Sequence, residues 1–200
     1  MILTLPPRLG PTRHMRSTIL LGSMASLRKA GHFERYQAAL AAQHRSTLLD
    51  AVAGVWVPID ATLAHYRACE SLGLTADAVI ELGRSTFRSA EGTLFGAVVR
   101  LAKGAGVTPW TVLPQFQRFW DRVADGGGVR VSELGPKDAR LDLVQCSIAE
   151  SPYFRYAMRG VVGAVLQMFC SRVYVQETSD PQHPQRARTP GTMSVRAQWA

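Results

Sequence analysis

The sequence changes its periodicity at three consecutive glycines, Gly126 to Gly128. Before them, apolar residues recur every three or four positions, which is typical of amphipathic helices. After them, apolar and polar residues alternate within residues 129–133, 141–143, 173–176 and 193–199, which is typical of half-buried strands. Residues 153–170 lie between two of these pairs and carry an apolar stripe at helical spacing. A helical half is therefore followed by the order strand–strand–helix–strand–strand.

Helices and strands that are segregated along a chain favour the α+β class. We expect N-terminal helices packed on a small, twisted antiparallel sheet. The apolar spacing and the breakers Gly54, Gly73 and Gly104 place the early helices. The predicted helices lie within residues 33–49, 58–73, 75–87, 94–104 and 109–123, and residues 19–21 suit a strand or a first helical turn.

A chain of 200 residues is most simply one domain, because this length buries about 70% of the unfolded surface without disulfides or metal. Residues 1–15 contain three prolines and no periodic pattern, which predicts a flexible tail. Residues 16–200 then form a single α+β domain of a ligand-binding kind. Met15 is a possible alternative start.

The charge pattern argues against specific recognition of nucleic acid. The formal net charge is +8, but the excess of Lys and Arg lies in the first and last fifty residues. No run of five bases occurs, whereas a nucleic-acid-binding face usually shows a dense basic stripe.

The cysteines and the apolar runs indicate the cellular compartment of the protein. Cys69, Cys146 and Cys170 form no C-x-x-C pair, and three thiols in a chain of this length fit a reducing cytoplasm. No apolar run reaches the 18 residues of a membrane span. We therefore expect a cytoplasmic protein without a membrane span.

The residues that carry most enzyme chemistry are not arranged in any familiar pattern. Carboxylates are sparse, and neither a nucleophile motif nor a phosphate loop occurs. His65 and Cys69, one helical turn apart, form the best pair of metal ligands, but two ligands do not complete a site. We expect no catalytic residues, no metal and no cofactor.

Aromatic side chains gather in the region before the glycines. They are either part of the core or the wall of an apolar pocket between helices and sheet. The candidate pocket residues are Phe95, Trp110, Phe116, Phe119, Trp120, Phe154, Met158 and Arg159. Arg159, or alternatively Arg118 or Arg122, could contact an acidic ligand, so the expected partner is an apolar or acidic small molecule.

Gly160 and Gly163 form a flat second surface on the helix that contains residues 153–170. Glycine inside a helix costs about 1 kcal/mol relative to alanine, and close approach of another backbone usually offsets this. The neighbour is either an early helix of the same chain or the same helix of a second chain. The second case predicts a homodimer.

An ordered set of short segments resembles a known bacterial family. The segments are residues 19–22, Leu82-Gly83-Arg84, Leu94 to Gly96, Leu113-Pro114, Glu133 to Pro136, the helix around Gly160, and Val195-x-Ala197-x-Trp199. Over residues 16–200 the chain resembles the DUF2378 type, a large paralogous group in myxobacteria. Its architecture is also similar to 4-vinyl-reductase-type domains, haem–nitric-oxide-binding domains and vesicle-tethering subunits, several of which enclose a ligand between helices and sheet.

The chain departs from the patterns of the ligand-binding relatives. It lacks the Tyr-x-Ser-x-Arg motif of the haem-binding domains, and its loop at residues 179–191 lacks the cysteines of the 4-vinyl-reductase type. The resemblance thus implies a non-enzymatic, small-molecule-binding sensor or regulatory module without haem or zinc. The alternative is an assembly module that acts through a homodimer helix face.

Overall fold

The computed structural model describes residues 1–4, 10–90, 107–178 and 190–200. Its main sheet is antiparallel, with strand order β1-β5-β6-β8-β7. These strands are β1 (Ile2–Thr4), β5 (Gly128–Gly135), β6 (Asp138–Val144), β8 (Met193–Trp199) and β7 (Val173–Glu177). Apolar residues of the central strands, such as Val131, Leu141 and Val195, are fully buried, so one face of this sheet forms the floor of the core.

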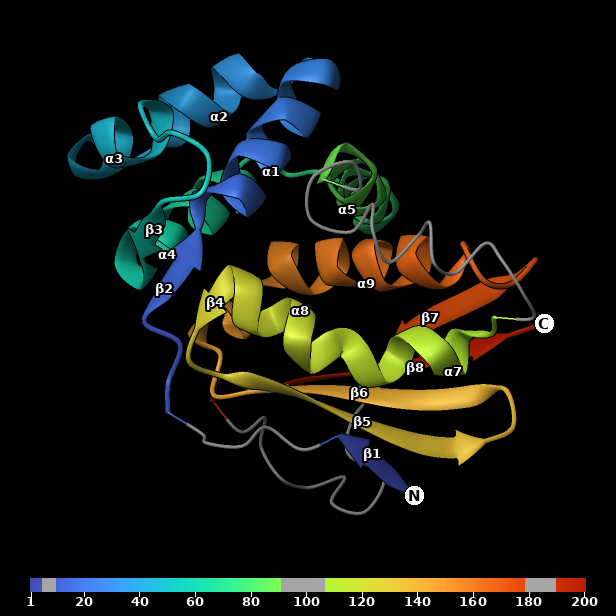
Figure 1. Cartoon of the computed structure of the whole chain (residues 1–200). Coiled ribbons are helices and arrows are strands. Elements are labelled where there is room, and N and C mark those ends of the chain that lie inside the picture. The colour runs from blue at the N-terminus through green and yellow to red at the C-terminus, as the bar shows by residue number, and fades with distance from the viewer. Residues whose placement is uncertain (5–9, 91–106, 179–189) are drawn as a thin grey trace.

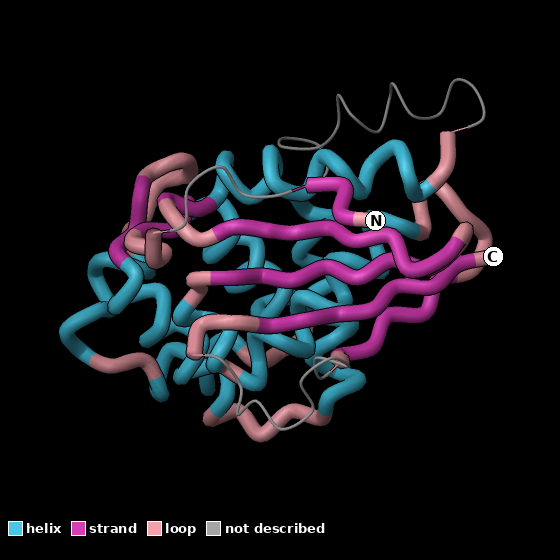
Figure 2. The backbone as a smooth tube through the Cα atoms, turned by 90° about the horizontal axis from the view of Figure 1, so that it is seen from below, coloured by secondary structure: helices cyan, strands magenta, loops and turns pink. Residues whose placement is uncertain are grey.

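Helices cover that face of the sheet in two layers (Figure 1). Helices α7 (Pro109–Val112), α8 (Phe116–Val123) and α9 (Pro152–Leu166) lie directly on the strands. Helix α5 (Ala76–Ala90) packs on top of α9. When the molecule is turned, the strands face the viewer and the helices lie behind them (Figure 2).

The remaining N-terminal elements pack beside α5 and α9. They are α1 (Ser17–Lys29), α2 (Phe33–Ala39), α3 (Arg45–Leu49) and α4 (Ile59–Glu70). A second, three-stranded antiparallel sheet has the order β3-β2-β4. It joins β2 (His14–Arg16) to β3 (Trp56–Pro58) and β4 (Ala124–Asp125).

Local sequence explains the longest elements. Helix α9 begins at Ser151, whose hydroxyl accepts a hydrogen bond from the Phe154 N–H at 3.2 Å, and Pro152 occupies the first helical position. Thr75 caps α5 in the same way through the Ala78 N–H. The α+β class and the late strand–strand–helix–strand–strand order are confirmed.

Residues 1–4 and 10–15, the described part of the predicted flexible tail, are held in the fold. Strand β1 pairs with β5, and Met15 of β2 is buried. Between them, the Thr12 N–H donates to Gln145 O at 2.8 Å, and its hydroxyl donates to the carbonyls of Gly126 and Gln145. The prediction was wrong because strands of only three residues leave no periodic pattern to recognise.

The three glycines make the turn that receives this N-terminal segment. Gly126 and Gly127 adopt positive φ angles of 92° and 67°, which side chains rarely tolerate. A Cβ on Gly126 would lie 2.3 Å from Pro11 O, and one on Gly127 would lie 2.4 Å from Thr12 Oγ1. Helix α8 ends before this run, at Val123, and the glycines instead link β4 to β5 and let residues 10–12 approach.

Some helix boundaries also differ from expectation. The predicted helix at 33–49 is divided into α2, a 3₁₀ turn at Ala42–His44 and α3. Residues 19–21 belong to α1. The predicted helix at 94–104 lies outside the described residues. In the part of the chain that the structure describes, no helix is long and apolar enough to cross a membrane.

Candidate functional site

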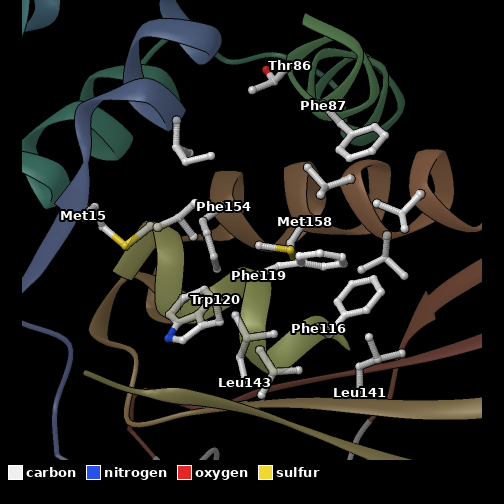
Figure 3. A pocket seen from close by; sticks show the side chains of 16 residues that line it. Met15, Thr86, Phe87, Phe116, Phe119, Trp120, Leu141, Leu143, Phe154 and Met158 are labelled. Atoms are coloured by element: carbon white, nitrogen blue, oxygen red, sulfur yellow. The ribbon is translucent and has the colours of Figure 1, made fainter. Parts of the chain in front are cut away.

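A cavity of about 110 Å³ lies between the sheet, α8, α9 and the N-terminal helices. Helix α9 supplies one wall with Phe154 and Met158, and α8 supplies another with Phe119 and Trp120 (Figure 3). The sheet closes the floor through residues such as Leu141, and α5 and α1 approach from the opposite side. The cavity therefore touches both the helical half and the sheet half of the chain.

The described residues that line the cavity are apolar, except for Thr86 and the indole of Trp120. The lining among the described residues is Met15, Ile19, Thr86, Phe87, Phe116, Phe119, Trp120, Val123, Val129, Leu141, Leu143, Phe154, Met158, Val161, Val162 and Val165.

Both of these polar groups are engaged within the protein. The Trp120 indole N–H donates to Gly126 O at 2.9 Å. Thr86 Oγ1 hydrogen-bonds with Leu82 O at 2.9 Å and with Ser26 Oγ at 3.1 Å. Figure 3 shows the nitrogen of Trp120 and the oxygen of Thr86 turned away from the centre of the cavity. The cavity thus presents carbon and thioether sulfur to its contents.

Sequence reasoning placed several of these side chains together. Phe116, Phe119, Trp120, Phe154 and Met158 all line the cavity. They come from one face of α8 and one stripe of α9, and the helical spacing of the apolar residues is what brought them together.

Other candidate pocket residues do not reach the cavity. The Trp110 indole donates to Pro136 O at 2.7 Å, and its ring packs edge-on against Trp199 with centroids 4.9 Å apart. Arg159 Nε donates to Val175 O at 3.3 Å. Arg159 is therefore not part of the described lining, and its contact with an acidic ligand stays a prediction. Phe95 lies outside the described residues.

The break between α7 and α8 explains why Trp110 was misplaced. A 3₁₀ turn at Leu113–Gln115, which contains Pro114, separates the two helices. The turn shifts the helical phase, since 3₁₀ and α-helices have different numbers of residues per turn. Extrapolating one continuous helix from Pro109 to Val123 therefore put Trp110 on the wrong side.

Sequence reasoning missed the cavity residues contributed by β2, α1, α5 and the sheet. Met15 was assigned to the tail, so its burial was not foreseen. Phe87 and the strand residues Val129, Leu141 and Leu143 carried a usable signal, because they belong to the apolar faces of their elements. The sequence does not show how these apolar faces pack around one cavity.

The predicted dimer face at Gly160 is covered by the protein itself. A Cβ on Gly160 would lie 2.0 Å from Ile80 O, and one on Gly83 would lie 2.1 Å from Ala157 O. Helices α5 and α9 therefore cross in backbone contact. Gly163 faces Val175 and Arg84 of the same chain. The close neighbour of Gly160 is thus an early helix of the same chain, and the homodimer stays a prediction that needs another surface.

A second group of polar side chains, around His65, is buried between α1, α2 and α4. His65 Nδ1 lies 2.8 Å from Tyr36 Oη, and Nε2 lies 3.1 Å from Ser23 Oγ. Cys69 Sγ lies 3.7 Å from the same Nε2. Burial lowers the pKa of His65 to about 3 and raises the pKa of the Cys69 thiol. Both ring nitrogens therefore have partners, and the imidazole is neutral.

This arrangement suits packing better than metal binding. Both ring nitrogens of His65 are already engaged by Tyr36 and Ser23. Over residues 1–4, 10–90, 107–178 and 190–200, no three His, Cys, Asp or Glu side chains come together in a way that could hold a metal ion.

A third polar group lies on the face of the main sheet that is opposite to the helices. Asp142 is buried and accepts hydrogen bonds from Arg130 Nε at 3.0 Å, Arg140 Nε at 2.7 Å and Ser194 Oγ at 2.6 Å. These bonds link β5, β6 and β8 across the sheet. Their role is to tie neighbouring strands together, and the cavity is the better candidate for a site.

Comparisons with known proteins identify the fold. No family model and no curated protein matches the chain, but solved structures of H-NOX domains do. An oxygen-binding H-NOX domain related to soluble guanylate cyclases has a TM-score of 0.60 and 14% identity, and covers 92% of this chain and 95% of its own.

Two further H-NOX structures match similarly. A Cs H-NOX that carries an unnatural amino acid has a TM-score of 0.63 at 13% identity, over 92% of this chain and 96% of that one. A T. tengcongensis H-NOX variant has a TM-score of 0.60 at 14% identity, over 92% and 97%. The architectural similarity to haem–nitric-oxide-binding domains is thus confirmed at the level of fold, whereas membership of the myxobacterial family stays a prediction.

Proposed function

We propose that this chain is a non-enzymatic sensor or regulatory module that binds a small molecule in the cavity between its helices and its sheet. The single observation that carries the proposal is the apolar pocket lined by Phe119, Trp120, Phe154 and Met158. Interiors are normally packed without voids larger than a water molecule, so a space of this size is a candidate for a ligand. The lining offers no titratable side chain among the described residues, which favours holding a molecule over transforming it.

The position of the cavity supports a regulatory role. A ligand there would contact Ile19 of α1 and Phe87 of α5 as well as Leu143 of the sheet. A ligand shifts a conformational equilibrium only if its contacts differ between the states. A ligand that contacts both halves would supply such a difference between states in which the halves are packed differently. The solved structures with this fold include a domain described as oxygen-binding, which is consistent with small-molecule sensing.

The proposal is tested by thermal unfolding with a panel of neutral, acidic and basic organic molecules of up to two fused rings. Each is measured on the wild type and on Val165→Phe, which places a large ring into the cavity wall. We expect at least one compound to raise the melting temperature of the wild type and to leave the variant unaffected. Val52→Phe is the matched control, since Val52 is 66% exposed.

If no compound stabilises the wild type more than Val165→Phe, the cavity is not a binding site and the proposal is wrong. Circular dichroism of each variant establishes that it is folded. A stabilisation that Val52→Phe also abolishes would place binding elsewhere and count against the cavity.

The alternative function, an assembly module acting through a helix face, has lost the surface on which it rested, since Gly160 packs against α5. A homodimer would need another surface. Sedimentation of the purified chain tests this prediction directly.

A further inference from the structure

The chemistry of the lining restricts what the cavity can hold. Its two nitrogen- or oxygen-bearing side chains, Trp120 and Thr86, already hydrogen-bond to Gly126, Leu82 and Ser26. A ligand group that needs a hydrogen bond would find no partner in the described lining. Burying such a group unpaired is unfavourable, and burying an unpaired charge is more so. The part of a ligand that contacts this lining must therefore be uncharged and apolar.

The size of the cavity restricts the choice of ligand further. An apolar cavity of about 150 Å³ lined by Leu, Ile and Phe stays dry and binds benzene or xenon. The present cavity, at about 110 Å³, has similar walls and slightly less room. It fits a molecule with a single aromatic ring, such as benzene or toluene.

The residues present do not fit a haem, the group named in the descriptions of some structures with this fold. Haem iron is held by His, by Cys, by Tyr, or by Met together with His. Of the four described histidines, His65 is buried away from the cavity with both ring nitrogens bonded, and His14 pairs with Asp125. His32 and His44 are also absent from the lining.

The undescribed segments add little to that inventory. Residues 5–9 and 91–106 contain no His, Cys, Met or Tyr, and residues 179–189 contain one candidate, His183. Met15 and Met158 line the cavity, but a thioether serves as an axial ligand beside a histidine. Haem also carries two propionates, and no Arg, Lys or His is found in the described lining to pair with them.

We propose that the cavity is a haem-free site for one small, uncharged, apolar molecule of about the size of benzene. This proposal rests on the proposed function and names the ligand class of that same site. It predicts selection by polarity among molecules of equal size, because the walls cannot satisfy a hydroxyl or a carboxylate.

The test is a calorimetric titration of the purified chain with toluene, phenol and benzoate, together with an optical titration with hemin. We expect toluene to bind with 1:1 stoichiometry. Phenol should bind about tenfold more weakly, since its hydroxyl is left unpaired, and benzoate should show no binding. Hemin should produce no stoichiometric Soret band.

Two variants tie binding to this cavity. Val165→Phe should abolish toluene binding, and Val52→Phe should preserve it. Since filling a packed core can prevent folding, Met158→Ala provides an independent measurement. Removing the Met158 side chain enlarges the cavity, so this variant should bind naphthalene, which the wild type should exclude.

The outcomes separate the two proposals. Binding of benzoate or hemin that Val165→Phe abolishes would overturn the ligand class and leave a small-molecule site in place. Equal binding of toluene and phenol would also overturn it. If none of the four probes binds in a way that Val165→Phe removes, and the Met158→Ala variant does not bind naphthalene, both proposals fail.

Discussion

His65 shows how burial fixes the protonation state of a single residue. Its side chain is fully buried, and this desolvation lowers its pKa to about 3, from a usual value near 6.5. The neighbours Tyr36, Ser23 and Cys69 are hydroxyl or thiol groups that bond to a neutral ring. A neutral imidazole has one donor and one acceptor nitrogen, and hydroxyls can match either.

The state of His65 predicts an acid-sensitive fold. Between about pH 6.5 and pH 3 the unfolded chain protonates His65 and the folded chain does not. The free energy of unfolding should therefore fall as the pH falls through this range, by about 1.4 kcal/mol per pH unit from this group. Urea unfolding at several pH values measures this pH dependence. The variant His65→Gln should show a smaller slope of the free energy of unfolding against pH. An identical slope in His65→Gln would contradict the assignment, and His44→Gln, outside the buried cluster, is the control.

Trp199 is the largest side chain on the buried face of β8. It is 8% exposed and packs against Trp110, and β8 lies between β6 and β7. Trp199→Ala should lower the free energy of unfolding by about 3–5 kcal/mol, the usual range for loss of a buried aromatic side chain. Trp56→Ala, at a 40% exposed position on β3, is the matched control and should cost much less. Equal losses at the two positions would contradict the described packing.

At the scale of elements, the crossing of α5 and α9 determines which glycines are required. Gly160 and Gly83 each lie against backbone of the other helix, whereas a Cβ on Gly163 would find its nearest neighbour, Val175 Cγ2, at 3.8 Å. A side chain at Gly160 or Gly83 would require one of the helices to move. The distance at Gly163 is an ordinary van der Waals contact.

The two glycines of α9 should therefore respond in opposite directions to alanine. Gly160→Ala should destabilise the protein because the added methyl collides with Ile80 O. Gly163→Ala should be neutral or stabilising by up to about 1 kcal/mol, the helix propensity gain. Thermal unfolding of the two variants checks this. A stable Gly160→Ala variant would show that α5 does not lie against α9 as described.

The N-terminal segment is the element that sequence reasoning misjudged, and it yields a further prediction. A chain that starts at Met15 loses β1, the Thr12 bonds to Gly126 and Gln145, and the contact between His14 and Asp125. We expect a marked fall in melting temperature or loss of soluble protein. Deleting only residues 1–4 should have a smaller effect, because Thr12 and β2 are kept. Unchanged melting of the chain that starts at Met15 would restore the tail interpretation.

These examples show what the sequence could and could not provide. Alternation along β8 and the apolar stripe of α9 are properties of one segment, so the sequence predicted both. The same stripe placed Phe154 and Met158 at the cavity. The packing of residues 10–12 against Gly126 and Gly127 depends on contacts between distant segments. Such contacts produce no periodic pattern in the sequence. The orientation of Trp110 depended on one 3₁₀ turn.

At the scale of the whole molecule, the cavity lies where the two halves of the chain meet. The α+β arrangement supplies one apolar face from the sheet and others from α8, α9, α5 and α1. These faces leave a space of about 110 Å³ between them. An apolar space of this kind is expected to be dry, so its affinity for apolar molecules is a property of the fold's packing and not of any one residue.

Xenon tests this account most directly, since it is a small, uncharged, apolar probe. In crystals of the full chain under xenon pressure, we predict one xenon atom inside the cavity, in contact with Phe119, Met158 and Leu143, and no ordered water there without xenon. The peak should be absent from crystals of Val165→Phe. Ordered waters filling the space, or xenon bound only at other positions, would contradict the claim that this is an apolar ligand site.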